Sequence, residues 1–290
     1  MPISSARRAL LLATAAMPFM SLRAAAADSA ADNMTALEKA SGGRIGVSAW
    51  NTGTRKHFGY RADERFPICS TFKTLLSAAM LARSEREPGL MQQRVAVTAA
   101  DMVFHAPVTE KHIGTGITIE QLCAAVIEYS DNPGANLLMK QMGGPAGVTA
   151  YARSLGDDVF RLDRWETELN TAVPGDLRDT TSPRAMAQLI DKLVFGTALN
   201  AQSREKLIAW LVSNKMGGPR IRGAVPAGWK VGDKTGTGAY GSTNDVGVVW
   251  PPGGAAPVVL AVYYTAEIKD AKSRVDVVAD AARLAIGAVT

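Results

Sequence analysis

The stretch Phe66-Pro67-Ile68-Cys69-Ser70-Thr71-Phe72-Lys73 decides how the rest of the chain is interpreted. It reads as a loop that runs into a helix, with Ser70 in the first turn and Lys73 on the same helix face three residues later. A helix N-terminus offers free backbone N–H groups and a partial positive charge, which favour a developing anion. Ser70 is therefore a candidate nucleophile with an amine beside it. Because a Ser-x-x-Lys pattern occurs by chance about once in a chain of this length, its meaning depends on the other motifs.

The first 27 residues have the composition of a secretory signal peptide. Arg7 and Arg8 form a basic start, residues 9–20 are apolar, and residues 24–27 offer a small-residue cleavage site. The apolar run is too short to span a membrane. We predict a signal peptide over 1–27 and a periplasmic mature protein without a membrane anchor. Export through the Sec route or the twin-arginine route is left open.

Net charge and histidine placement exclude two function classes. The formal charge of +5 falls to +2 when the signal peptide leaves, because that segment holds three arginines and no acidic residue. Since no basic block remains, nucleic-acid binding is not predicted. His57, His105 and His112 are scattered without metal-ligand spacing. We therefore expect no metal and no cofactor.

Strand patterns stand at both ends of the chain, and helical patterns fill the middle. This order predicts an α/β (α+β) fold, in which one antiparallel five-stranded sheet is built from both chain ends and flanked by helices, with an all-α lobe inserted. The α/β lobe is predicted over 28–68 and 213–290, and the helical lobe over 69–212. Helices are predicted for 28–42 and 270–289, and strands for 44–50, 57–61, 229–235, 246–250 and 258–265.

Three short motifs follow one another in the chain: Ser70-Thr71-Phe72-Lys73, Ser130-Asp131-Asn132 and Lys234-Thr235-Gly236. Alone, the second is an ordinary inter-helix turn and the third an ordinary strand end. Together, in this order, they are specific, and with Glu166-Thr167-Glu168-Leu169-Asn170 they make the chain resemble a class A serine β-lactamase. The resemblance covers essentially the whole mature chain and implies the serine β-lactamase/DD-peptidase fold.

The resemblance implies roles for the polar residues of these motifs. Ser70 would be the nucleophile, Lys73 would take or relay its proton, and Ser130 would protonate the leaving nitrogen. Glu166 would activate the water that releases the acyl-enzyme, although the base for acylation, Glu166 or Lys73, stays open. The residues implied in binding substrate or water are Asn132, Asn170, Lys234, Thr235 and Thr237, and the oxyanion hole would be the backbone N–H groups of Ser70 and Thr237.

Residues 161–179 resemble the Ω-loop that carries this glutamate. Arg164 and Asp179 form an opposite-charge pair that would close its ends. Members of the family often have a cis peptide bond after the glutamate, so we predict a cis Glu166–Thr167 bond. We interpret Asp131 as structural, binding backbone groups of its loop.

Both cysteines lack the partner that the resemblance would give them. Cys69 would pair near position 238 and Cys123 with position 77, but this chain has Gly238 and Ser77 there. The resemblance places Cys123 beside position 77, which lies two helical turns, about 12 Å, from position 69. A disulfide needs Cα atoms within about 7 Å. We therefore expect both thiols to be free.

Two further positions bear on substrate range. Many class A enzymes carry an arginine on the strand after Lys-Thr-Gly, and residues 241–244 offer none here. Arg220 would replace it and bind the substrate carboxylate with its guanidinium fork, as in carbapenem-hydrolysing members. His105 stands where an aromatic gatekeeper is usual and could stack on substrate.

The predicted function is hydrolysis of penicillins and cephalosporins through an acyl-enzyme on Ser70, by a monomeric enzyme that confers antibiotic resistance. Extended-spectrum and carbapenem activity are left open. The rivals are a penicillin-binding transpeptidase or carboxypeptidase, which Glu166 and Asn170 argue against, and a β-lactam sensor that acylates and stalls. A sensor would usually have a membrane segment, which the mature sequence lacks.

Overall fold

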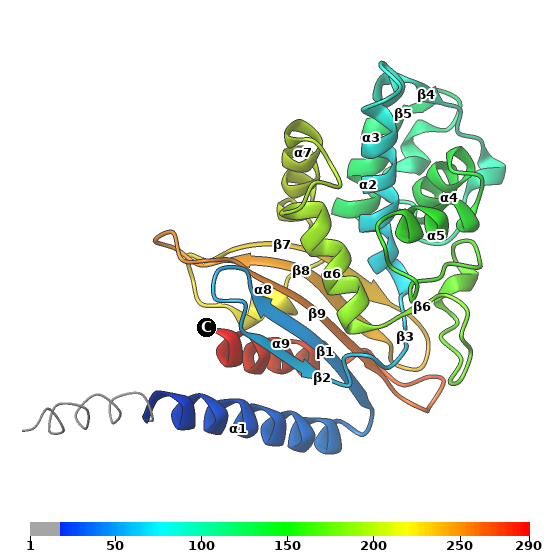
Figure 1. Ribbon diagram of the computed structural model, residues 1–290. Coiled ribbons are helices and arrows are strands. Elements are labelled where there is room, and N and C mark those ends of the chain that lie inside the picture. Colours follow the sequence, from blue (N-terminus) through cyan, green and yellow to red (C-terminus); the bar gives the residue numbers. More distant parts are fainter. Residues whose placement is uncertain (1–17) are drawn as a thin grey trace, which may run out of the picture.

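The computed structural model describes residues 18–290, with side chains from residue 29 onward. A five-stranded antiparallel sheet in the order β2-β1-β9-β8-β7 forms one half of the molecule, and a helical part lies beside it (Figure 1). The strands are β1 Arg44–Asn51, β2 His57–Tyr60, β7 Lys230–Thr237, β8 Thr243–Trp250 and β9 Val258–Thr265. The predicted sheet, with strands contributed by both ends of the chain, is confirmed.

The register of the sheet places the third motif opposite the start of β8. Gly236 of β7 pairs with Asn244, and Lys234 pairs with Val246. The strand β8 begins at Thr243, three residues before the predicted start at position 246. Its first residues, Thr243, Asn244 and Asp245, are polar yet buried, which is why an apolar pattern does not reveal them.

Helices cover both faces of the sheet. The N-terminal helix α1 (Pro18–Ser41) and the C-terminal helix α9 (Val275–Val289) lie on one face, and α6 (Pro183–Val194) packs on the other (Figure 1). The expectation that the first helix begins at residue 28 is wrong, because alanine, the strongest helix former, occupies positions 24–27 and the helix continues through them. The prediction that the last helix starts at 270 is also wrong, by five residues. The remainder of the predicted signal peptide, 1–17, lies outside the described residues.

The segment between β2 and β7, built of helices, short strands and loops, holds eight of the eleven candidate residues. Side-chain caps stand at the start of two of these helices: the Thr118 hydroxyl accepts a hydrogen bond from the Gln121 N–H, and Oε1 of Gln121 accepts one from the Thr118 N–H. The Ser182 hydroxyl caps α6 by accepting a hydrogen bond from the Ala185 N–H. The elements are β3 Phe66–Pro67, α2 Phe72–Ser84, β4 Arg94–Val95, β5 Ile117–Thr118, α3 Ile119–Glu128, α4 Asn132–Gln141, α5 Pro145–Ser154, β6 Thr180–Thr181, α7 Ala201–Val212 and α8 Ile221–Ala224.

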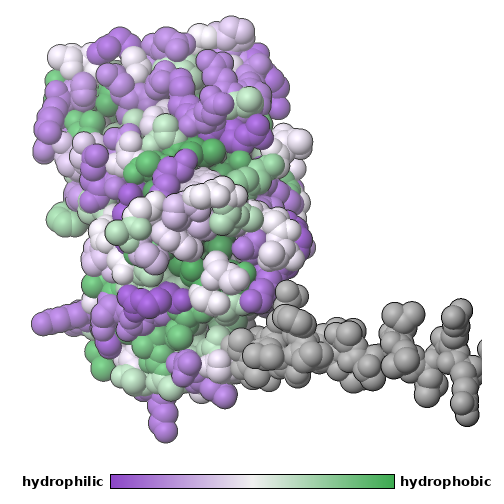
Figure 2. Space-filling view, turned by 90° about the vertical axis from the view of Figure 1, so that its left-hand side faces the viewer, coloured by the Kyte–Doolittle hydropathy of each residue, from purple (hydrophilic) through white to green (hydrophobic). Residues whose placement is uncertain are grey.

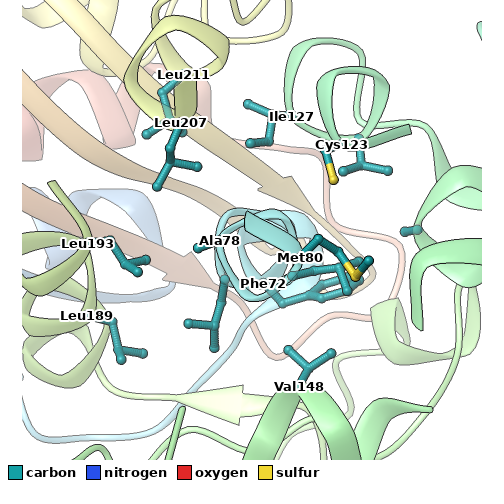
Figure 3. Close-up of a cluster of buried hydrophobic side chains, with 14 of the residues drawn as sticks. Phe72, Ala78, Met80, Cys123, Ile127, Val148, Leu189, Leu193, Leu207 and Leu211 are labelled. Atoms are coloured by element: carbon teal, nitrogen blue, oxygen red, sulfur yellow. The ribbon is translucent and has the colours of Figure 1, made fainter. Parts of the chain in front are cut away.

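The helix α2 is the centre of the helical part. Every residue from Phe72 to Leu81 is buried, and side chains from the surrounding helices converge on it (Figure 3). Ser70 lies in the short 3₁₀ turn Cys69–Thr71 that leads into this helix. Burial stabilises this helix by roughly 1.5–3 kcal/mol for each large apolar side chain, and it thereby fixes the positions of Lys73 and of Ser70, the candidate nucleophile.

The surface of the helical part is largely hydrophilic on the face shown in Figure 2. Among residues 18–290, no helix is long and apolar enough to cross a bilayer.

Cys69 and Cys123 are both buried and free, as expected. Burial raises the pKa of the Cys69 thiol to about 12, so this thiol stays protonated at neutral pH.

The absence of a disulfide gives a first prediction. Titration of the denatured, unreduced protein with a thiol reagent should find two reactive thiols for each chain, and prior reduction should not raise that number. The native protein should react slowly at both positions, because both side chains are buried. A count of zero thiols in the unreduced sample would contradict the structure.

Candidate active site

Lys73 is the hub of the candidate site. Its side chain is fully buried, and its Nζ lies 3.0 Å from Ser70 Oγ, 2.8 Å from the backbone O of Ser130 and 2.6 Å from Asn132 Oδ1. Nζ also lies 2.9 Å from Oε1 of Glu166. Burial lowers the pKa of Lys73, while the Glu166 carboxylate acts in the opposite direction. The amine is thus poised to exchange a proton with its neighbours.

Ser70 opens into a cavity of about 320 Å³. Its hydroxyl donates to Oε1 of Glu166 at 3.4 Å and accepts from Nζ of Lys73 at 3.0 Å, so a carboxylate and an amine both lie within reach of it. Eleven residues line this cavity, and eight of them are candidates from the sequence. The lining residues are Ser70, Phe104, His105, Ser130, Asn132, Thr167, Asn170, Met216, Arg220, Thr235 and Thr237.

The hydroxyl of Ser130 lies between two buried amines. Lys234 Nζ donates to it at 3.1 Å, and Lys73 Nζ lies at 3.4 Å. Lys234 also donates to the backbone O of Thr235. Burial, followed by the positive charge of Lys73, lowers the pKa of Lys234 well below its ordinary value. A proton lost from Ser130 can therefore be replaced from a neighbouring amine.

Asp131 stabilises the turn that carries Ser130. This buried carboxylate accepts hydrogen bonds from the backbone N–H groups of Val108, Thr109 and Gly134, and from the Thr109 hydroxyl. The prediction that Asp131 is structural is confirmed by these bonds. These bonds fix the backbone of the turn, and the next residue, Asn132, accepts a hydrogen bond from Lys73.

Glu166 is held by two asparagines. Asn170 Nδ2 donates to Glu166 Oε2 at 2.5 Å. The amide group of Asn136 binds both the backbone N–H and the backbone O of Glu166, each at 2.9 Å. The Glu166–Thr167 bond is cis, as predicted. Among the described residues, the buried Oδ1 of Asn170 has no hydrogen-bond partner, so a polar acceptor faces the space beside the carboxylate.

The predicted clasp of the Ω-loop is present. Arg164 Nε donates to Asp179 Oδ2 at 2.5 Å. Asp179 is 1% exposed, and its Oδ1 also accepts from the backbone N–H groups of Asp163 and Arg164. The carboxylate therefore ties both ends of residues 161–179 together.

Arg220 lies at the far wall of the cavity, on the turn before α8. Its Nη1 donates to the backbone O of Gly236 at 2.9 Å and of Asn244 at 2.7 Å, and its Nη2 donates to Thr237 Oγ1 at 2.8 Å. His105 lies at the opposite rim, where Nε2 is 2.8 Å from the backbone O of Tyr129. The structure thus brings every candidate residue from the sequence to one cavity or directly beneath it.

A larger cavity, about 770 Å³, lies between the Ω-loop and the first strand. None of the candidate residues lines it, although Pro67, three residues before Ser70, does. We take the smaller cavity as the candidate active site, because Ser70 lines it and does not line the larger one. Within residues 18–290, no group of three or more histidine, cysteine or acidic side chains is arranged to hold a metal ion.

The sequence was compared with known protein families and with known proteins. Residues 29–289 match the model of the beta-lactamase enzyme family. A carbapenem-hydrolyzing beta-lactamase KPC of Klebsiella oxytoca is 51% identical over 97% of this chain and 96% of its own length. Beta-lactamase CTX-M-25 of Escherichia coli is 47% identical over 97% of each chain.

The chain belongs to the class A serine β-lactamase family. A solved β-lactamase structure from Desulfarculus baarsii DSM 2075 superposes with a TM-score of 0.88 at 51% identity and covers 89% of this chain and 96% of that one. The fold expected from the sequence is therefore confirmed by comparison as well as by topology.

The sequence motifs missed three residues of this β-lactamase site. Asn136 holds Glu166 and stands four residues after Asn132, on the same face of α4, so helical spacing could have indicated it. Phe104 is 84% exposed at the rim of the cavity, beside His105. Asn244 contacts the segment before Ser70, and only the β7–β8 register reveals this position.

Removal of the clasp carboxylate gives the second prediction. Asp179→Ala leaves the Arg164 guanidinium and two backbone N–H groups without their acceptor, so the free energy of unfolding should fall by about 2–3 kcal/mol. Urea denaturation measures this change. Asp280→Ala, which breaks an exposed ion pair with Arg283 on α9, should change stability by less than about 1 kcal/mol. Equal losses in the two variants would contradict the assigned role of Asp179.

Proposed function

We propose that this protein hydrolyses the β-lactam amide of penicillins and cephalosporins through an acyl-enzyme on Ser70. The observation that carries the proposal is the position of Ser70 Oγ, which lies 3.0 Å from buried Lys73 and 3.4 Å from Glu166. A hydroxyl beside a buried amine and a carboxylate, in a cavity of substrate size, is suited to covalent catalysis.

In the acylation step, Ser70 Oγ attacks the β-lactam carbonyl carbon, and its proton passes either to the neutral amine of Lys73 or to the carboxylate of Glu166, which lies 2.9 Å from that amine. The ring C–N bond then breaks, and Ser130 donates its proton to the leaving nitrogen. The amines of Lys73 and Lys234 lie close enough to resupply Ser130. Each proton that leaves Ser70 therefore has a route to the nitrogen.

The negative charge that develops on the carbonyl oxygen needs two donors. We assign them to the backbone N–H groups of Ser70 and Thr237, two residues that both line the cavity. Loss of one such donor costs about 2.7–4 kcal/mol in the transition state. Their fixed positions would therefore supply a large share of the rate.

In the deacylation step, Glu166 takes a proton from a water molecule, whose oxygen attacks the acyl-enzyme ester and releases Ser70. Asn170 supports this role, because its Nδ2 orients the carboxylate and its Oδ1 faces the same space. This step separates a hydrolase from a transpeptidase or a sensor, in which the acyl-enzyme persists or transfers to another acceptor.

The substrate would be held by its carboxylate at one wall and by its side-chain amide at the other. Arg220, Lys234, Thr235 and Thr237 form the positively charged wall, and Arg220 Nη2 already points to the Thr237 hydroxyl. Asn132 would bind the side-chain amide. His105 would stack on the side chain at the rim.

Location and assembly are part of the proposal. We infer a periplasmic monomer that protects the cell from β-lactam antibiotics after removal of residues 1–27, with an α/β lobe of 28–68 and 213–290 and a helical lobe of 69–212. The name of the KPC relative supports a test of carbapenems, and steady-state kinetics with a carbapenem would decide that extension.

Glu166→Ala supplies the direct test of this mechanism. With a chromogenic cephalosporin, the wild-type protein should turn over continuously, whereas the variant should give a burst of one equivalent and then stop. Mass spectrometry should find the added acyl mass on the peptide that contains Ser70. Glu168→Ala, at a nearby exposed position, should retain turnover. A wild-type burst without turnover would instead support a transpeptidase or a sensor.

Arg220→Ala tests the carboxylate wall. Charge-assisted hydrogen bonds contribute about 1.5–3 kcal/mol, so kcat/KM for penicillins should fall about 10- to 100-fold. A penicillin methyl ester, which lacks the carboxylate, should lose much less. Arg283→Ala on the exposed face of α9 is the matched control and should leave both substrates unaffected. An equal loss for acid and ester would contradict this role.

A further inference from the structure

The residue before the nucleophile adopts a backbone conformation that L-residues rarely adopt. Cys69 has a φ of +46°, and such a conformation persists only where the surroundings over-determine it. The preceding residue is anchored on several sides. The Ile68 N–H donates to the backbone O of Asp179 at 2.9 Å, and the Thr71 hydroxyl donates to the backbone O of Ile68 at 2.7 Å.

A side chain from the sheet completes this anchoring. Nδ2 of Asn244 donates to the backbone O of Pro67 at 2.8 Å and of Ile68 at 3.2 Å. Asn244 is 1% exposed, so water does not replace these bonds readily. Its Oδ1 is buried without a partner among the described residues. A buried amide oxygen without a hydrogen bond costs free energy. The two hydrogen bonds that Nδ2 donates offset this cost.

The backbone of Asn244 connects to the opposite wall of the cavity. Asn244 pairs with Gly236 across the β7–β8 ladder, and Arg220 Nη1 donates to the backbone oxygens of both residues. Thr237, the proposed second oxyanion donor, directly follows Gly236. One residue therefore links the strand that carries one donor to the segment that carries the other.

The two walls touch closely at this point without a covalent bond. A Cβ added at Gly236 would lie 3.0 Å from the backbone O of Ile68 and 3.2 Å from Cys69 Cβ. The Cys69 thiol is free, so noncovalent contacts alone set the separation of the walls. The hydrogen bonds of Asn244 are the directional part of that contact.

We propose that Asn244 is a positioning residue of the oxyanion site. Its carboxamide sets the separation between the backbone N–H groups of Ser70 and Thr237, and thereby the polarisation of the carbonyl that both would bind. The inference rests on the proposed function, because it needs an acyl-enzyme on Ser70. A purely structural role would change stability without changing that polarisation.

The test uses Asn244→Ala in the full-length chain, alone and combined with Glu166→Ala. Alone, the variant should lower kcat/KM for a chromogenic cephalosporin about 10- to 100-fold, because displaced oxyanion donors weaken transition-state binding. In the combined variant, the infrared stretch of the acyl-enzyme ester carbonyl should move to a higher wavenumber than in Glu166→Ala, because a less polarised C=O bond is stronger.

Asn51→Ala is the matched control. Asn51 is also a buried asparagine, and its Oδ1 accepts from the backbone N–H groups of Gly53 and Thr54 in a hairpin far from the cavity. It should lower Tm without moving the carbonyl band. If Asn244→Ala does not accumulate as folded protein, Asn244→Ser, which leaves a hydroxyl and a smaller cavity, carries the same measurements and expected direction.

An unchanged band and an unchanged kcat/KM, with a lowered Tm, would overturn the positioning role and leave the proposed function intact. A wild-type protein that forms no acyl-enzyme with the cephalosporin would instead overturn the proposed function, and this inference with it. The two failures are distinguishable, because the first is seen only in the variant.

Discussion

The burial of the Lys73 amine is the constraint on which the rest of the site depends. An ammonium group removed from water costs several kcal/mol unless charges and hydrogen bonds compensate it. Here the compensation comes from Ser70, Ser130, Asn132 and Glu166, all within 3.4 Å of Nζ. These partners belong to three separate segments, so the amine is satisfied only when the helical part and the Ω-loop are both assembled.

This dependence explains why so many residues near the site bind backbone groups and not substrate. Asp131 holds the turn of Ser130, Asn136 holds the backbone of Glu166, and Asp179 closes the loop that carries it. Each is buried or partly buried and satisfies groups that would otherwise be costly. A partly satisfied polar network is less stable than an apolar core, so the supporting residues determine whether the proposed catalytic groups keep their geometry.

Much of this architecture follows from local sequence. The capping pair of Thr118 and Gln121, the apolar face of α2 and the alternating strands at the chain ends predict elements that the structure contains. The short motifs predict which residues share the cavity. The start of β8 and the role of Asn244 could not be predicted, because buried polar residues are stabilised by partners almost 180 positions away in the chain. Local pattern contains no information on such long-range pairs.

Burial and this set of partners keep the Lys73 amine ready to exchange protons. The most direct measurement is an NMR titration of the side-chain Cε of Lys73 in protein with ¹³C-labelled lysine, assigned with a Lys73→Arg variant. Because burial lowers the pKa of Lys73, its resonance should titrate below the ordinary lysine value of about 10.4. A Lys73 that titrates at or above the ordinary value would contradict the account.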